Sequence, residues 1–151
     1  MGKMLVEEAL EEAVVFRLKM EHIDQQVRGG GPGGWWFGIW EPDEVFEPDP
    51  KKPSARRPVD LGQVDDRRLV ADPDCWKLDP SGKWHGFSDI SRDYVMLDPL
   101  KVTITTPGID PDGRMTDFGI PAGIVARFLR ERGIVVEKTG FYSLLVLFTL
   151  G

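Results

Sequence analysis

The fold of this chain is decided by residues 117–151, DFGIPAGIVARFLRERGIVVEKTGFYSLLVLFTLG, which carry its strongest periodic signals. Apolar residues at helical spacing predict a helix whose first turn contains Pro121, because proline loses no hydrogen bond there. Gly133 is expected to end this helix in a left-handed conformation. The expected apolar face of the helix consists of Ile120, Ile124, Val125, Phe128 and Leu129.

Two strands are expected after this helix. Residues 134–136 are β-branched, residues 137–140 interrupt them as a turn, and residues 143–150 form an almost unbroken apolar run. Such a run predicts a strand that is covered on both faces. A terminal strand of this kind needs cover. We therefore expect the chain to be part of a larger protein or to pack against another subunit.

Composition excludes several classes of function. The chain has 151 residues and 41% apolar residues, which is enough for one ordinary domain. Its net charge of −6 argues against sequence-independent binding of nucleic acid. A single cysteine, Cys75, excludes an internal disulfide framework and suits a reducing compartment. No apolar run reaches membrane-spanning length and no secretory leader is recognisable, so we expect a cytoplasmic protein.

The first half of the chain reads as a helix followed by loop-rich segments. Residues 6–28 predict one long amphipathic helix. The run GGGPGG at 29–34 indicates a flexible linker, because a phosphate-binding loop would end in Gly-Lys-Ser/Thr. Residues 35–42, WWFGIWEP, predict a short aromatic strand. Residues 43–74 are proline-rich, and we expect a partly mobile surface excursion. This excursion contains a small basic patch of Lys51, Lys52, Arg56 and Arg57.

Two short apolar blocks flank a predicted turn in the middle of the chain. They are CWKL at 75–78 and WHGF at 84–87, with the turn at 79–82. Cys75 and His85 could form a nucleophilic pair, but a histidine between two aromatic residues is more often packed and hydrogen-bonded. No set of residues has the spacing of a zinc site, so we expect no metal.

A strand is predicted at 101–106, with Val102 and Ile104 on one face and Thr103 and Thr105 on the other. Together with the helices, these strands predict an α/β (α+β) fold in which helices pack on a small mixed sheet.

Three sequence blocks then resemble a known family. They are DPLKVTITTPG at 98–108, DFGIPA at 117–122 and GIVVEKTG at 133–140. These blocks are similar to the bacterial pyridoxal-phosphate-dependent ornithine/lysine/arginine decarboxylases. The blocks WWFGIWEP, CWKL and WHGF look like the same family in the same order. The likeness is weak at 43–74.

The resemblance implies a domain organisation. Residues 1–34 would be a linking helix with its Gly-rich linker, and residues 35–151 the small C-terminal domain of a fold-type I pyridoxal phosphate enzyme. In this family a lysine that directly follows Ser-x-His carries the cofactor as a Schiff base. No lysine here follows a histidine. The resemblance therefore implies a decarboxylase fragment that is inactive alone, with pyridoxal phosphate held only by the full-length enzyme.

The implied partners are the remaining decarboxylase domains or subunits of a homo-oligomer, and a basic amino acid as substrate. The sequence does not distinguish lysine, ornithine and arginine. A stand-alone interaction or regulatory module that keeps the same fold is the alternative.

The same resemblance implies a group of site residues. Glu137 would lie near the distal end of the substrate, where its carboxylate could hold an ammonium or guanidinium group. Thr139 and Gly140 would shape the turn beside it. Trp84 and His85 could line the cleft. The alternative for Glu137 is a surface carboxylate paired with the lysine that follows it.

Overall fold

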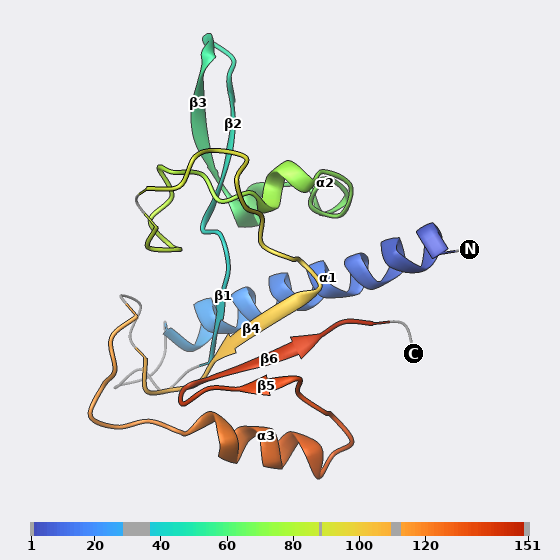
Figure 1. Cartoon of the computed structure of the whole chain (residues 1–151), viewed down its shortest axis with the longest axis vertical. Helices are drawn as coiled ribbons and strands as arrows, with labels where there is room; N and C mark the ends of the chain where they lie inside the picture. Colours follow the sequence, from blue (N-terminus) through green and yellow to red (C-terminus); the bar gives the residue numbers. More distant parts are fainter. Residues whose placement is uncertain (1, 29–36, 88, 110–112, 150–151) are drawn as a thin grey trace. The chain divides into compact units, whose positions relative to one another are not determined.

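The computed structural model describes most of the chain, and Figure 1 traces it from end to end. The described residues are 2–28, 37–87, 89–109 and 113–149, with the backbone alone at 2–5 and 21–28. The expected linker at 29–34 and the first two tryptophans of the aromatic block lie outside these ranges.

The chain divides into two compact units. Unit 1 comprises residues 1–15, 41–99 and 150, and unit 2 comprises residues 16–40, 100–149 and 151. Helix α1 (Gly2–Arg28) contributes its first half to unit 1 and its second half to unit 2. The predicted long helix is thus confirmed, and it begins four residues before the expected start.

Unit 2 is built on a four-stranded sheet with the order β1-β4-β6-β5. Its strands are β1 (Gly38–Trp40), β4 (Lys101–Thr105), β6 (Ser143–Leu147) and β5 (Lys138–Thr139). The α/β (α+β) class is confirmed. The strand pairings are all antiparallel, so the expectation of a sheet with mixed strand directions was wrong.

The core of unit 2 follows the register of this sheet. Ile104 pairs with Ile39 on one side and Leu144 on the other, and Val102 pairs with Val146. Since alternate residues share a face, these side chains lie together and pack against helix α3 (Ala122–Arg130). The predicted alternation along β4 is confirmed, with Val102 and Ile104 buried.

Helix α3 ends as expected. Gly133 has a φ of 80°, and its N–H donates to Arg130 O at 3.0 Å. The Ile134 N–H donates to Leu129 O at 3.0 Å. These two bonds form the motif that satisfies the last helical carbonyls when a glycine takes the left-handed conformation.

The buried face of α3 matches the expected one only in part, because Val125 and Leu129 pack against the core as expected. Ala122 and Ala126 are buried, whereas Ile124 and Phe128 are 62% and 52% exposed. Ile120 precedes the helix. Alanine lets the helix backbone approach the sheet closely, so the buried face is rotated by about one position. The larger side chains Ile124 and Phe128 are therefore left outside.

The strands after α3 also lie at other positions than predicted. Residues 134–136 are not a strand, and β5 comprises Lys138–Thr139, which had been assigned to the turn. The turn lies further on, where the Gly140 N–H donates to Ser143 O at 2.7 Å. Pairing with β6 decides the position of β5, because a strand exists only where a partner strand accepts its hydrogen bonds. β6 is an internal strand between β4 and β5, not an open edge.

Unit 1 contains the hairpin of β2 (Glu44–Asp49) and β3 (Lys52–Asp60), which are antiparallel. Three short helices follow: η1 (Leu61–Gln63), α2 (Asp66–Ala71) and η2 (Pro73–Trp76). The proline-rich surface excursion expected at 43–74 therefore contains a regular hairpin and short helices, which the sequence did not predict. An aspartate side chain caps the start of each short helix. Asp60 accepts from the Gly62 N–H at η1, Asp65 from the Arg67 N–H at α2, and Asp72 from the Asp74 N–H at η2.

Candidate functional site

Glu137 lies directly before β5 in unit 2. Its backbone N–H donates to Leu145 O at 2.8 Å, so pairing with β6 fixes the position of its backbone. The side chain is exposed. Among the side chains that the structure describes, the Glu137 carboxylate has no hydrogen-bond or ion-pair partner, and the alternative pairing with Lys138 is not formed.

Thr139 and Gly140 belong to the same hairpin. Thr139 pairs with Leu144 across the β5–β6 ladder, and both Thr139 and Gly140 are exposed. A Cβ on Gly140 would lie 2.7 Å from Ser143 Oγ, so the turn has little room for a larger residue. The structure thus brings the three predicted residues together in one hairpin.

The β5–β6 turn is tied to the segments that follow β4 and precede α3. The Thr106 N–H donates to Tyr142 O at 2.9 Å, and the Ala122 N–H donates to Phe141 O at 2.8 Å. The Tyr142 ring packs so closely on Gly108 that a Cβ there would lie 2.5 Å from Cε1. Tyr142 was not among the site residues predicted from the sequence. The only sequence signal for this contact is the glycine after Pro107, which does not reveal its partner.

Trp84 and His85 lie in unit 1, whereas the Glu137 hairpin lies in unit 2, and each is described within its own unit. His85 is buried. Its Nδ1 accepts from the Phe87 N–H at 3.0 Å, so Nε2 carries the proton and donates to Asp79 O at 2.9 Å. The half-buried Trp84 ring meets His85 edge-on. The alternative of a packed, hydrogen-bonded histidine is therefore confirmed.

Cys75 is not an activated nucleophile. Its side chain is 2% exposed, and burial, followed by the nearby Asp72 carboxylate, raises the pKa of the thiol to about 11. The thiol is therefore protonated at neutral pH. Both ring nitrogens of His85 are engaged elsewhere. The possible Cys75–His85 nucleophilic pair is therefore not formed, because burial keeps the thiol protonated and other hydrogen bonds occupy the imidazole.

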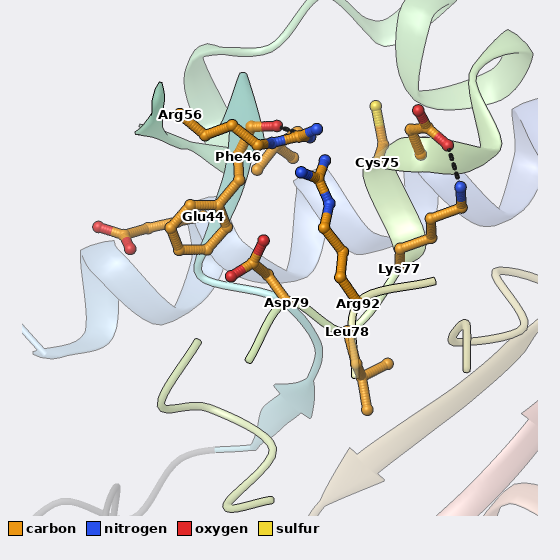
Figure 2. Close-up of a pocket in the computed structure, with 10 residues that line it drawn as sticks. Glu44, Phe46, Arg56, Cys75, Lys77, Leu78, Asp79 and Arg92 are labelled. Carbon is orange, nitrogen blue, oxygen red and sulfur yellow. Dashed lines mark hydrogen bonds and ion pairs between the residues drawn. The ribbon is translucent and has the colours of Figure 1, made fainter. Parts of the chain in front are cut away.

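Cys75 also borders a small hollow in unit 1, shown in Figure 2. Arg56 and Arg92 extend into it from two segments, opposite the carboxylate of Asp79. Lys77 at its rim forms ion pairs with Asp74 at 2.6 Å and Asp93 at 2.7 Å. The water-accessible space of about 10 Å³ holds about one water molecule. The hollow is thus too small for a substrate.

The described ranges offer neither a metal site nor a membrane-spanning helix. These residues contain no group of three or more His, Cys, Asp or Glu side chains that could hold a metal ion. Within the same part of the chain, no helix combines the length and apolar character needed to cross a lipid bilayer.

The antiparallel sheet and the helix packed on it place the chain in the α/β (α+β) class. Comparisons with known proteins identify its family. The family model "Orn/Lys/Arg decarboxylase, major domain" matches residues 1–151. Lysine decarboxylase LdcA of Pseudomonas aeruginosa is 45% identical over 99% of this chain. The constitutive lysine decarboxylase of Escherichia coli K12 is 41% identical over 99% of the chain. A solved structure of the E. coli constitutive lysine decarboxylase matches 99% of the chain with a TM-score of 0.69.

The chain therefore belongs to the ornithine/lysine/arginine decarboxylase family, as the sequence resemblance implied. It spans only 17% of the length of both lysine decarboxylases and 17% of the solved chain.

The hollow of unit 1 does not fit pyridoxal phosphate, which the sequence resemblance implies for the full-length enzymes. Pockets for organic ligands usually measure about 300–1,000 Å³, whereas the hollow of unit 1 holds about one water molecule. The lysine at that hollow, Lys77, is held by two aspartates. This hollow therefore offers neither the space nor an unpaired lysine that the cofactor would need.

Proposed function

We propose that this chain is the substrate-holding part of a pyridoxal-phosphate-dependent basic amino acid decarboxylase. In this proposal the cofactor and its Schiff-base lysine belong to other parts of the enzyme, and the chain alone is inactive. The observation that carries the proposal is the Glu137 carboxylate, which has no partner among the described side chains and is held by a paired backbone, in a chain that belongs to the decarboxylase family. Lysine is the first candidate substrate because two relatives similar over 99% of the chain are lysine decarboxylases.

The chemistry of Glu137 suits this role. A basic amino acid carries a cation at the end of its side chain, and a carboxylate positioned by rigid backbone can hold that cation at a defined distance. The bond from Glu137 N–H to Leu145 O supplies the rigid backbone. The side chain remains exposed and unpaired within the described residues, so it needs no rearrangement before it binds a cation.

Thr139 and Gly140 support this arrangement through the shape of the turn. The bond from Gly140 N–H to Ser143 O closes the hairpin, and the absence of a side chain at Gly140 leaves room for Ser143 Oγ. We propose that Gly140 is a positioning residue, which acts on the substrate only through the orientation of Glu137. Trp84 and His85 remain predicted cleft-lining residues. His85 would contribute its ring surface, because its nitrogens are engaged within unit 1.

The first test separates a fragment from an independent enzyme. The purified chain is incubated with pyridoxal phosphate and, in separate reactions, with lysine, ornithine or arginine. We expect no lasting cofactor absorbance and no release of carbon dioxide. Turnover by the chain unaided would refute the proposal, and so would a cofactor bound covalently to one of its own lysines.

The second test concerns Glu137 in a full-length decarboxylase that contains this segment. Loss of a hydrogen bond to a charged group costs about 1.5–3 kcal/mol, so Glu137→Gln should raise the KM for the preferred amino acid about 10- to 100-fold. The affinity for pyridoxal phosphate should remain unchanged. Glu131→Gln is the matched control, because Glu131 is exposed and lies just beyond α3. An unchanged KM in the Glu137 variant would refute the role assigned to it.

A further inference from the structure

The strand that follows Glu137 has little support of its own. β5 comprises only Lys138 and Thr139 at the edge of the sheet (Figure 1), and in the described part of the chain it pairs with β6 alone. Because an isolated pair of strands is only marginally stable, so short a strand keeps its position only where its ends are fixed. At one end the Glu137 N–H donates to Leu145 O, and at the other end the chain turns through Gly140 into β6. The orientation of Glu137 therefore depends on how firmly this turn is held.

Two backbone hydrogen bonds hold the turn from outside the hairpin. Phe141 O accepts from the Ala122 N–H at 2.8 Å, and Tyr142 O accepts from the Thr106 N–H at 2.9 Å. The two donors belong to separate segments, because Ala122 begins α3 and Thr106 follows β4. Thr106 is 1% exposed, and its Oγ1 donates to Ile120 O at 2.6 Å, which joins these segments to each other. The turn is thus bound to two segments that are themselves connected.

The half-buried Tyr142 ring lies where these segments meet. A Cβ on Gly108 would lie 2.5 Å from Tyr142 Cε1, and a Cβ on Gly119 would lie 2.8 Å from the same atom. The ring therefore packs directly on backbone at two points that carry no side chain. Gly108 has a φ of 126°, which favours glycine. Among the described residues the Tyr142 hydroxyl forms no hydrogen bond, so the ring and not the hydroxyl makes this contact.

We propose that Tyr142 is a positioning residue for the Glu137 carboxylate. Its ring, packed on Gly108 and Gly119, fixes the turn from which β5 leads back to Glu137. The connection is short, because the extended chain from Gly140 to Glu137 measures about 10 Å. Tyr142 itself makes no contact with the substrate in this proposal, which rests on the proposed role of Glu137.

Substitution of Tyr142 in a full-length decarboxylase that contains this segment tests the role of the ring. Tyr142→Ala should raise the KM for the preferred amino acid about 3- to 10-fold, because a displaced carboxylate holds the distal cation less well. The kcat and the affinity for pyridoxal phosphate should stay within about twofold of the wild type. Tyr142→Phe keeps the ring and should retain the wild-type KM. Circular dichroism checks the fold, and Tyr142→Leu replaces the alanine variant if that variant does not fold.

A double-mutant cycle tests whether Tyr142 acts through Glu137. If it does, adding Tyr142→Ala to Glu137→Gln should raise the KM no further than Glu137→Gln alone, within about twofold. A merely structural role of Tyr142 would instead multiply the two effects. A second measurement uses the same amino acid without its distal cation, which is norleucine in the case of lysine. Its inhibition constant should be unchanged by Tyr142→Ala, because it offers Glu137 no cation to hold.

Leu69→Ala is the control for general destabilisation, because Leu69 is 1% exposed in unit 1 and its loss should leave the KM unchanged. Three results would overturn the positioning role while Glu137→Gln still raises the KM. They are an unchanged KM in Tyr142→Ala, an equal loss in Tyr142→Phe, and independent effects in the double variant. An unchanged KM in Glu137→Gln would instead refute the proposed function, and the role of Tyr142 with it.

Discussion

Two backbone segments cross closely in unit 2 at Gly119. We expect an alanine at this crossing to destabilise the fold, and an alanine at Gly123 in the nearby helix α3 to stabilise it. The segment after β4 meets the segment before α3 at Gly119, where the Ile120 N–H donates to Pro107 O at 2.7 Å and Thr106 Oγ1 donates to Ile120 O at 2.6 Å. A Cβ on Gly119 would lie 2.4 Å from Pro107 O and 2.5 Å from Gly108 Cα. Both atoms belong to the backbone, so they cannot move aside as a flexible side chain would.

The magnitude follows from this overlap. Carbon atoms in contact are usually about 3.5–4.0 Å apart, so Gly119→Ala must push the two segments apart by about 1 Å. Overpacking typically costs about 1–3 kcal/mol, and weakening one of the two crossing hydrogen bonds adds about 1 kcal/mol. We therefore expect Gly119→Ala to lower the free energy of unfolding by about 2–4 kcal/mol.

Gly123 in the first turn of α3 supplies the control, because a Cβ there would meet no heavy atom within 4 Å. Alanine is the better helix former, so Gly123→Ala should raise the free energy of unfolding by about 0.5 kcal/mol. Urea unfolding followed by circular dichroism measures both variants. A cost below about 1 kcal/mol for Gly119→Ala, at an unchanged denaturant slope, would refute the reasoning about the crossing.

Two further predictions concern buried side chains. Leu144 is 2% exposed, and Leu147 on the same strand is 39% exposed. In urea unfolding, Leu144→Ala should therefore lower the free energy of unfolding by about 3 kcal/mol, and Leu147→Ala by less than about 1 kcal/mol. Equal costs for the two variants would contradict the described core. Cys75 should react with iodoacetamide at neutral pH about 100-fold more slowly than in the unfolded chain, because the fold raises its pKa from 9.0 to about 11. The raised pKa favours the folded state only while the thiol is neutral. The thiol's contribution to the free energy of unfolding should therefore be complete below about pH 9 and decline as the pH rises through 11. Cys75→Ala should remove this dependence of stability on pH.

Much of the fold was predictable because its signals are local. The apolar period of α1, the glycine that ends α3 and the alternation along β4 each depend on residues within a few positions of one another. The hairpin within the proline-rich segment was not predicted, because prolines usually mark loops. Its hairpin depends on cross-strand pairs such as Phe46 with Pro58, which composition does not reveal.

The candidate site likewise has features that the sequence predicts and features that only the fold shows. Glu137, Thr139 and Gly140 are neighbours in the sequence, so a turn was bound to bring them together. The contact of Tyr142 with Gly108 and Gly119 joins residues more than twenty positions apart, and only the folded chain shows it. Cys75 and His85 had suitable chemistry for a nucleophilic pair, but burial and existing hydrogen bonds remove it.

The amino-acid sequence by itself determined the fold class, the long first helix and the decarboxylase family, because periodicity and short motifs are properties of the chain in order. Tertiary structure alone decided which face of α3 is buried, where β5 pairs with β6, and which of the described side chains have no partner. These outcomes depend on distances between remote segments. Cross-strand hydrogen bonds and the burial of side chains form only when those segments come into contact. No local sequence pattern specifies which segments come into contact.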